Sequence, residues 1–161
     1  LLLCLLRVSS SFANDRRVHC YAENGYRFSA GLVPPKERRG LVLMDPSYEL
    51  DDEFETAIAT VGKLHRQFST GTVALWYPIL DERRTARLRR QIEGLPMRNV
   101  LHIALRVADR KSIPGMYGSG MIIVNPPWTL RTTMETALPF LAAALGRNNK
   151  AGFQIEQWVE E

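Results

Sequence analysis

Asp45, Pro46, Ser47 and Tyr48 place an acid, a proline, a hydroxyl and an aromatic ring in one run, directly behind the apolar segment 40–44. The Asp45 carboxylate and the Pro46 backbone carbonyl could each accept one N–H bond from the same amine. The exocyclic amine of a nucleobase is a poor nucleophile because its lone pair is conjugated into the ring, and two such acceptors favour a pyramidal nitrogen that can attack. Tyr48 could stack on the base, a contact worth about 1–3 kcal/mol. The run is therefore suited to hold an amine beside an aromatic ring, and an ordinary turn is the alternative.

The elements around this run predict where it lies. Gly40 to Met44 is typical of a strand buried on both faces, as in parallel sheets. Asp51 to Phe68 is the clearest helix, and Asp52 with Glu55 three residues on resembles a capping box. The apolar stripe of this helix consists of Phe54, Ile58, Val61, Leu64 and Phe68. Open α/β sheets bind ligands at the carboxyl ends of their strands, so the Asp45 run falls where a ligand is expected.

The rest of the chain alternates strands and helices. In chain order the pattern predicts a strand at Val18–Glu23, a turn at Asn24-Gly25, a short helix at Tyr26–Leu32, a strand at Thr72–Tyr77 closed by Pro78, a helix from Asp81 to Glu93, strands at Asn99–Val107 and Gly120–Val124, a helix at Thr129–Leu145 bent or interrupted near Pro139, and a final strand at Phe153–Val159. This alternation favours an α/β fold with a mainly parallel sheet whose last strands form an antiparallel pair.

A second run, Asn125-Pro126-Pro127-Trp128, has a similar pattern of residue types. It follows the strand predicted at 120–124. If that strand is antiparallel, its carboxyl end lies at the opposite edge of the sheet from Asp45. Asn125 would then cap the following helix, proline would sit in the first helical turn and Trp128 would pack. We therefore expect the Asp45 run to carry the chemistry.

Composition limits the classes of protein to which the chain can belong. It has 161 residues, of which 45% are apolar, and this suits one domain with a real core. The net charge of +4 permits a nucleic-acid partner. Cys4 and Cys20 fit no metal spacing and are expected to be free thiols. The histidines are scattered without a ligand pattern, so no metal site is expected. No stretch is long and apolar enough for a membrane span.

The Asp45 run resembles the Asp-Pro-Pro-Tyr tetrapeptide of S-adenosylmethionine-dependent enzymes that methylate an exocyclic amine, most often N6 of adenine, with Ser47 in place of the second proline. The segments Arg38–Glu49, Ala74–Pro78 and Ser119–Trp128 together are similar to one family. That family is the bacterial 23S ribosomal RNA adenine-N6 methyltransferase, also described in connection with the use of external DNA as a nutrient. The resemblance runs from about residue 17 to residue 161.

The resemblance implies a set of functional residues. It makes Asp45, Pro46 and Tyr48 catalytic, with the Asp45 carboxylate and the Pro46 carbonyl orienting the amine. It also implies that Asn24, Gly25 and Asp45 bind the cofactor, S-adenosyl-L-methionine, and that no metal takes part. The family usually has aspartate at position 24, so Asn24 is a departure that keeps a hydrogen-bond acceptor but carries no charge. A plain turn is the alternative for Asn24-Gly25.

Further residues are candidates for contact with the nucleic acid. Ser47, Trp76 and Tyr77 are expected near the target adenine, and packing in the sheet is the alternative for the two aromatic residues. One predicted helix also carries several arginines that could meet phosphates or simply form a solvated face. They are Arg83, Arg84, Arg87, Arg89 and Arg90.

These implications combine in one expectation. Residues 1–161 would be the carboxyl-terminal part of a single methyltransferase catalytic domain of the Rossmann-like class I fold, with the amino-terminal half of the domain, and its glycine-containing cofactor loop, lying upstream. The implied function is S-adenosylmethionine-dependent N6-methylation of an adenine in 23S ribosomal RNA by a cytoplasmic, monomeric enzyme, of which this part alone is inactive. The alternatives are a DNA adenine-N6 methyltransferase and a nucleic-acid-binding module that has lost catalysis.

Overall fold

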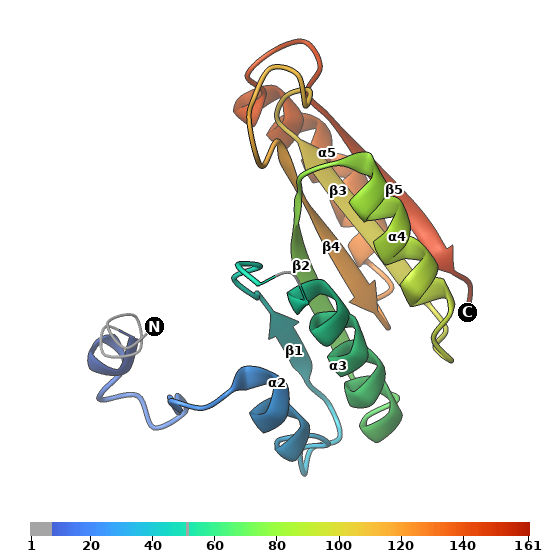
Figure 1. The fold of residues 1–161 in the computed structure, drawn as a ribbon. Helices are drawn as coiled ribbons and strands as arrows, with labels where there is room; N and C mark the ends of the chain where they lie inside the picture. The colour runs from blue at the N-terminus through green and yellow to red at the C-terminus, as the bar shows by residue number, and fades with distance from the viewer. Residues whose placement is uncertain (1–7, 51) are drawn as a thin grey trace.

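The computed structural model describes residues 8–50 and 52–161. Five strands form one sheet in the order β1-β2-β4-β3-β5 (Figure 1). Their bounds are Leu41–Met44 for β1, Thr72–Ile79 for β2, Val100–Arg106 for β3, Gly118–Val124 for β4 and Gly152–Val159 for β5. The helices are α2 (Gly25–Phe28), followed directly by the 3₁₀ helix η1 (Ser29–Gly31), then α3 (Glu53–Gln67), α4 (Glu82–Glu93) and α5 (Leu130–Leu145).

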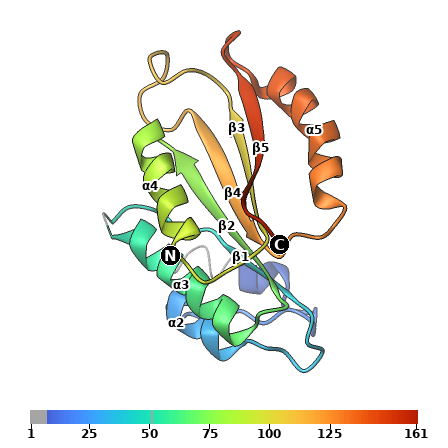
Figure 2. The same ribbon diagram turned by 90° about the vertical axis from the view of Figure 1, so that its right-hand side faces the viewer.

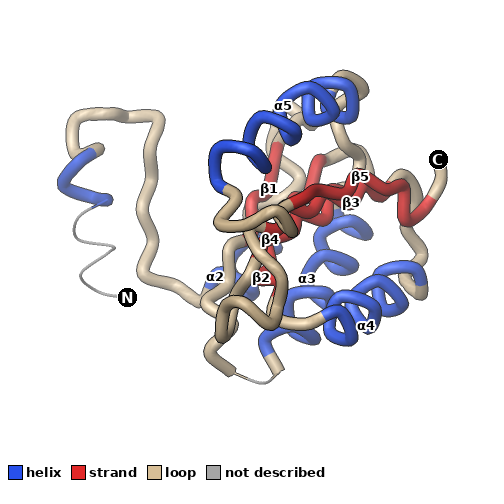
Figure 3. Tube along the Cα trace, turned by 90° about the horizontal axis from the view of Figure 1, so that it is seen from above, coloured by secondary structure: helices blue, strands red, loops and turns tan. Residues whose placement is uncertain are grey.

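The helices cover both faces of the sheet. Figure 2 and Figure 3 show α3 and α4 on one face and α5 on the other. The larger core lies on the α3–α4 side and the smaller one under α5, where Leu138 packs against Leu101, Ile103 and Ile123. The α/β class predicted from the sequence is therefore confirmed.

The sheet is mixed, and one of its four described strand pairings is parallel, that of β1 with β2. The pairs β2–β4, β3–β4 and β3–β5 are antiparallel. The prediction of a mainly parallel sheet is therefore wrong in detail. A loop without a helix joins β3 to β4, and strands connected in this way pair antiparallel. Because β4 then inserts between β2 and β3, the antiparallel part of the sheet is larger than one terminal pair.

Burial of β1 on both faces was predicted, but within the described residues only one of its faces is covered. Met44 is buried against the α3 side, whereas Leu41 and Leu43 are 65% and 64% exposed. These two leucines alternate with Val42 and Met44 and so point to the other face of the sheet. The α5 cluster reaches as far as Ala74 of β2 and does not include residues of β1. Among the described strands, β1 is an edge strand that pairs with β2 alone.

Helix α3 follows the predicted stripe but not the predicted cap. Ile58, Val61 and Leu64 are buried on its inner face. Asp52 makes no side-chain cap bond, because its backbone does not adopt the extended conformation of a capping residue. Glu55 pairs with Arg87 of α4 instead. The capping box is therefore absent, whereas Asp81 caps α4 as predicted, accepting a bond from the Arg84 amide at 2.8 Å.

Three local predictions differ from the structure. The segment 18–23 is not a strand; it lies away from the sheet (Figure 3), so no strand of the described residues lies beside it to form a ladder. Strand β2 continues through Pro78 to Ile79. Strand β1 pairs only as far as Leu75, so Pro78 has a neighbouring strand on one side only, and its missing N–H breaks no ladder bond on the other side. Helix α5 is not interrupted at Pro139, which is exposed, so water can satisfy the freed carbonyl.

Candidate methyl-transfer site

The carboxyl end of β1 opens into a cleft of about 770 Å³. The loop 45–50, which the sequence predicts to be catalytic and which is named the catalytic loop for that reason, contributes residues 45–47 to one wall, and the start of α2 forms another. Five of the residues predicted for the site line this cleft: Asn24, Gly25, Asp45, Pro46 and Ser47. The structure therefore brings together the predicted cofactor pair and the predicted catalytic acid, although they lie far apart in the sequence.

Asn24 is the N-cap of α2, where the prediction was a turn. Its Oδ1 accepts a bond from the Arg27 amide at 3.2 Å, which is the usual arrangement for a capping asparagine. The Oδ1 acceptor is used by this cap, and the Nδ2 amide group is left as the part of the side chain that could meet a ligand. A Cβ added at Gly25 would meet no atom within 4 Å. Gly25 therefore faces open space and not the packed protein.

Tyr48 is held outside the cleft. Its hydroxyl donates to the Trp76 backbone carbonyl at 2.6 Å, and its ring centroid lies 4.3 Å from that of Phe54. Burial raises the pKa of Tyr48, so the hydroxyl stays protonated. Its φ of 55° is the left-handed region that a bulky residue rarely adopts. These contacts fix the middle of the catalytic loop, and stacking of Tyr48 on a base stays a prediction.

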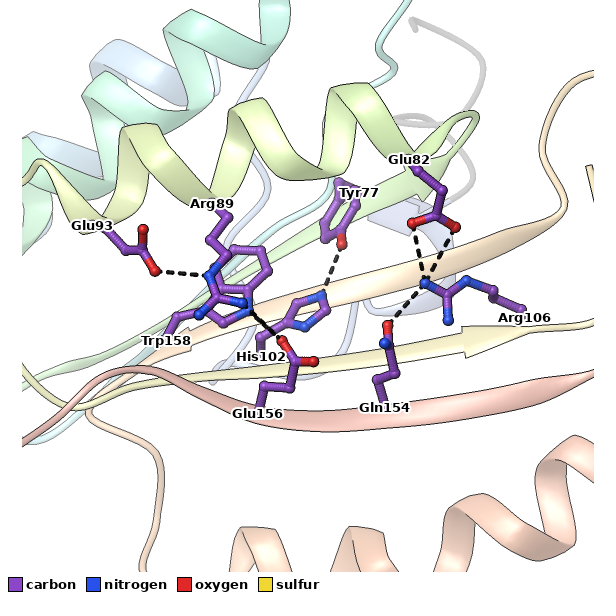
Figure 4. Close-up of polar contacts among 9 residues, drawn as sticks. All are labelled: Tyr77, Glu82, Arg89, Glu93, His102, Arg106, Gln154, Glu156 and Trp158. Carbon is purple, nitrogen blue, oxygen red and sulfur yellow. Dashed lines mark hydrogen bonds and ion pairs between the residues drawn. The ribbon is translucent and has the colours of Figure 1, made fainter.

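Trp76 and Tyr77 differ in their access to a ligand. Trp76 is half-buried beside Tyr48. Tyr77 is 1% exposed, and its hydroxyl lies 2.8 Å from His102 Nε2 in the packed layer beneath α4 (Figure 4). A Cβ at Gly120 would come within 2.3 Å of the Tyr77 ring, so this glycine makes room for it. Of the two alternatives for Tyr77, burial favours packing over contact with adenine, because the alternating strand turns its side chain into the core.

The lining of the cleft is acidic. Three of its residues carry carboxylates, Glu23, Asp45 and Glu53, and none of its described lining residues is basic. Burial, followed by the negative charges of Glu53 and Asp52, raises the pKa of Tyr26 to about 12. An opening with this charge favours a ligand that carries positive charge near the carboxylates. Asp45 itself is exposed and available to such a ligand.

Glu53 is a residue of the cleft that sequence reasoning did not single out. It is the first residue of α3, and its carboxylate accepts a bond from the Ser47 hydroxyl at 3.1 Å. The signal that could have revealed it is an acid at the start of the helix that follows the catalytic loop.

The second tetrapeptide lies at the other end of the sheet. Val124, the last residue of β4, pairs with Val73 near the start of β2. Met44, the last residue of β1, pairs with Leu75, which is closer to the carboxyl end of β2. The side-chain Nδ2 of Asn125 donates to the backbone carbonyls of two residues that precede β2, Ser69 at 2.7 Å and Gly71 at 2.9 Å. Asn125 thus makes loop contacts in place of the predicted helix cap.

Two related expectations for this run are wrong. The cap position of α5 belongs to Thr129, so the prolines precede the helix and do not sit in its first turn. Trp128 is 92% exposed and does not pack. Asn125 already satisfies backbone groups and has a φ of 50°, which turns the chain sharply before the helix begins.

The arginines of α4 are partly neutralised. Arg87 pairs with Glu55 at 2.7 Å and Arg89 with Glu93 at 2.7 Å, while Arg84 lies 3.7 Å from Asp81. Arg83 and Arg90 are exposed, and no contact with an acid is found for either in the part of the chain that the structure describes. Both readings of this helix, phosphate contact and solvated face, stay open for these two residues.

Across residues 8–50 and 52–161, no group of three or more histidine, cysteine or acidic side chains is placed to hold a metal ion. Within the same residues, every helix is too short or too polar to cross a membrane.

A family of known proteins matches almost the whole chain. The family described as "Ribosomal RNA large subunit methyltransferase D, RlmJ" matches residues 4–160. The chain belongs to this family. The resemblance seen in the sequence is thereby confirmed. The RlmJ family is one of ribosomal RNA methyltransferases by its description.

Individual relatives agree with the RlmJ match. The chain is 37% identical over 150 residues to the ribosomal RNA large subunit methyltransferase J of Haemophilus influenzae, covering 93% of the chain and 53% of the relative. It is 35% identical over 136 residues to the protein of that name from Escherichia coli, covering 84% and 49%. A crystal structure of a Legionella pneumophila protein is similar, with a TM-score of 0.76, 29% identity, and coverage of 84% and 49%. The chain spans about half the length of the curated relatives it matches.

Proposed function

We propose that the protein carrying this chain transfers a methyl group to N6 of an adenine in 23S ribosomal RNA, and that this chain supplies the catalytic loop. The observation that carries the proposal is the position of Asp45 and Pro46 at the carboxyl end of β1, in one cleft with Asn24 and Gly25. Membership of the RlmJ family supports the reaction class. The names of the two curated relatives support ribosomal RNA as the substrate.

Asp45 and Pro46 act on the amine in this proposal. The exposed Asp45 carboxylate and the Pro46 carbonyl each accept one N6–H bond, which draws the nitrogen towards a pyramidal form and aims its lone pair across the cleft. S-adenosylmethionine, when bound, would supply the methyl group: the N–C bond would form as the C–S bond of its sulfonium breaks, with the electron pair left on sulfur. The amine then loses its proton to solvent or to Asp45 late in the reaction. An acceptor placed for the transition state is worth roughly 10²–10³ in rate.

The charge of the cleft lining supports S-adenosylmethionine as the cofactor. This cofactor supplies an electrophilic methyl group on a positively charged sulfonium. The carboxylates of Glu23, Asp45 and Glu53 favour that charge. Gly25 leaves open space beside the cap of α2, where the Asn24 Nδ2 amide group could donate to an adenine edge.

The proposed RNA substrate also draws on α4. Arg83 and Arg90 are exposed basic side chains on a helix that follows β2, the strand beside the catalytic loop. Contacts of this kind with phosphates would add affinity without sequence preference. A ribosomal RNA substrate agrees with a cytoplasmic, monomeric enzyme, which we propose as well.

We also propose that this chain is the carboxyl-terminal part of one catalytic domain. The exposed Leu41 and Leu43 on an edge strand support a further layer there, since apolar side chains of a strand are normally covered. Under this proposal, the chain alone binds S-adenosylmethionine weakly or not at all. Titration calorimetry that detects micromolar binding to residues 1–161 would contradict it.

Methyl transfer by the complete protein tests the function. Purified protein is incubated with S-adenosylmethionine and unmodified 23S ribosomal RNA, and with DNA of the same sequence, and nucleosides are separated after digestion. We expect N6-methyladenosine from the RNA. Methylation of the DNA alone would favour the rival DNA methyltransferase. Cofactor-independent binding of RNA without any methylation would favour a binding module that has lost catalysis.

A further inference from the structure

Glu53 connects the catalytic loop to the start of α3. Its two carboxylate oxygens lie 3.1 and 3.3 Å from the Ser47 hydroxyl, which donates to them. One of these oxygens also lies 3.5 Å from the Leu50 amide, at the long end of hydrogen-bond distance. A single side chain thus touches the loop at both ends of the segment 47–50.

The contacts of Glu53 enclose the strained residue of the loop. Tyr48, with a φ of 55°, lies between Ser47 and Leu50, and its hydroxyl is held separately by the Trp76 carbonyl. A bulky residue keeps a left-handed backbone only where its surroundings hold it there. Ser47 and Leu50 on the Glu53 side, and Tyr48 on the β2 side, are therefore the points that set the direction of the Asp45-Pro46 backbone.

Ser47 gives this contact a specific meaning. It stands where the tetrapeptide that the chain resembles has a proline, which would fix the loop through its ring. Serine has no such restraint, but its hydroxyl can be held by an acid, as Glu53 holds it here. The hydrogen bond between Ser47 and Glu53 can therefore restrain the loop in place of a proline ring.

We propose that Glu53 is a positioning residue for methyl transfer, holding the catalytic loop through Ser47 so that Asp45 and the Pro46 carbonyl face the amine. The proposal rests on the proposed function. Glu53 also faces α2, where its charge contributes to the raised pKa of Tyr26. The acid therefore lies between the two walls of the cleft.

A simpler role for Glu53 must be separated from this one. An acid in the first turn of a helix stabilises the helix through its dipole whether or not it touches a loop. Glu55 is the matched control, because it is the other acid in the first turn of α3 and pairs with Arg87, with no bond to the catalytic loop. A dipole effect would appear in both variants.

Two measurements on the complete protein test the proposal. In hydrogen exchange, Glu53→Ala should speed exchange of the loop amides 47–50 by about tenfold through local opening, whereas Glu55→Ala should leave them unchanged. In methyl-transfer assays, Glu53→Ala should lower kcat by about tenfold with little change in KM, and Glu53→Gln, which keeps an acceptor for the Ser47 hydroxyl, should recover most of it.

The Ser47→Pro background decides whether Glu53 acts through Ser47. Ser47→Pro alone should keep methyl transfer within about tenfold of the parent protein. In that background Glu53→Ala should lower kcat by less than about twofold, because the proline ring restrains the loop instead. Equal losses in both backgrounds, or unchanged exchange of the loop in Glu53→Ala, would overturn the proposal. Absence of methyl transfer in the parent protein would count against the proposed function, while the exchange result would still decide the contact.

Discussion

The two tetrapeptides of the chain have similar residue types and opposite situations. Each follows an apolar strand and each contains a residue with a left-handed backbone, Tyr48 in the first and Asn125 in the second. In the first, the acid is exposed in a cleft and the aromatic is held by hydrogen bond and packing. In the second, the amide is used by the fold and the aromatic, Trp128, is exposed.

The difference comes from the direction of the strands. Strand β4 runs antiparallel to β2, so its carboxyl end lies at the start of β2, where Asn125 can bind the carbonyls of Ser69 and Gly71. Strand β1 runs parallel to β2, so Asp45 emerges at the open end. The polar side chain of such a run is therefore available to a ligand only where the fold does not already use it to satisfy backbone hydrogen-bonding groups.

The largest expected loss of stability is at the aromatic of the first tetrapeptide. Tyr48→Ala removes the bond to the Trp76 carbonyl and the packing on Phe54, and should lower the free energy of unfolding by about 3 kcal/mol. Tyr48→Phe should lose only the hydroxyl contribution, about 1 kcal/mol. Urea unfolding of both variants gives the values. A loss below that of Tyr48→Phe in the alanine variant would show that this aromatic is as dispensable as Trp128.

Asn125→Ala should lower the free energy of unfolding by about 2 kcal/mol, from two lost bonds to backbone carbonyls and a left-handed alanine. The loss arises from loop contacts and not from a helix cap. Asn125→Gly separates the two causes, since glycine adopts the same backbone freely and should recover about 1 kcal/mol of the loss. If the urea midpoints of Asn125→Ala and Asn125→Gly coincide, the lost hydrogen bonds account for the whole loss of stability.

Mild acid should weaken the sheet that holds the two loops apart. Burial, and then the positive charges of Arg106 and Arg89, lower the pKa of His102 to about 3 in the folded protein (Figure 4). The unfolded chain binds a proton there below about pH 6.5 while the folded chain does not, so stability falls as the pH drops from 6.5 towards 3. Between pH 7 and 5.5 the parent should lose about 1 kcal/mol more than His102→Gln.

Thermal melts at the two pH values measure this difference. The glutamine in His102→Gln keeps an acceptor for the Tyr77 hydroxyl and cannot titrate. Equal losses of stability in the parent and in His102→Gln would mean that His102 is not the group responsible.

The smallest effect is expected at the aromatic of the second tetrapeptide. Trp128 is 92% exposed, so Trp128→Ala should change the free energy of unfolding by no more than about 0.5 kcal/mol. The same urea titration as for Tyr48→Ala makes the contrast direct. A loss of several kcal/mol would place Trp128 in a packed site and remove the main difference between the two runs.

Local features of the fold could be predicted from the sequence. The stripe on α3, the Asp81 cap of α4 and the strand before Asp45 each depend on residues within a few positions of one another. The position of the second tetrapeptide could also be predicted: once the strand before it is antiparallel, it must lie at the opposite edge of the sheet from Asp45. Asn24 and Gly25 were joined to Asp45 by family resemblance, and the structure puts all three in one cleft.

The features that sequence reasoning missed depend on distant partners. The exposure of Leu43 depends on which strand and helix lie beside β1, and the burial of Tyr77 on the space left by Gly120 across the sheet. The lost cap at Asn125 reflects carbonyls more than fifty residues away. No local pattern encodes these pairings. Glu53 is the exception: it lies six residues after Ser47 at the start of a helix, which is a local signal, but the hydrogen bond between them forms only when the loop folds back.

Methyl transfer by two single variants tests most directly which tetrapeptide is catalytic. In the complete protein, tritiated methyl incorporation into unmodified 23S RNA is compared for Asp45→Ala and Asn125→Ala, at a temperature where melts show both to be folded. Asp45→Ala should lose at least about 10²-fold in rate with its stability retained, because the exposed acid is needed only by the amine. Asn125→Ala should turn over almost normally. An inactive Asn125→Ala beside an active Asp45→Ala would contradict the assignment of the catalytic loop.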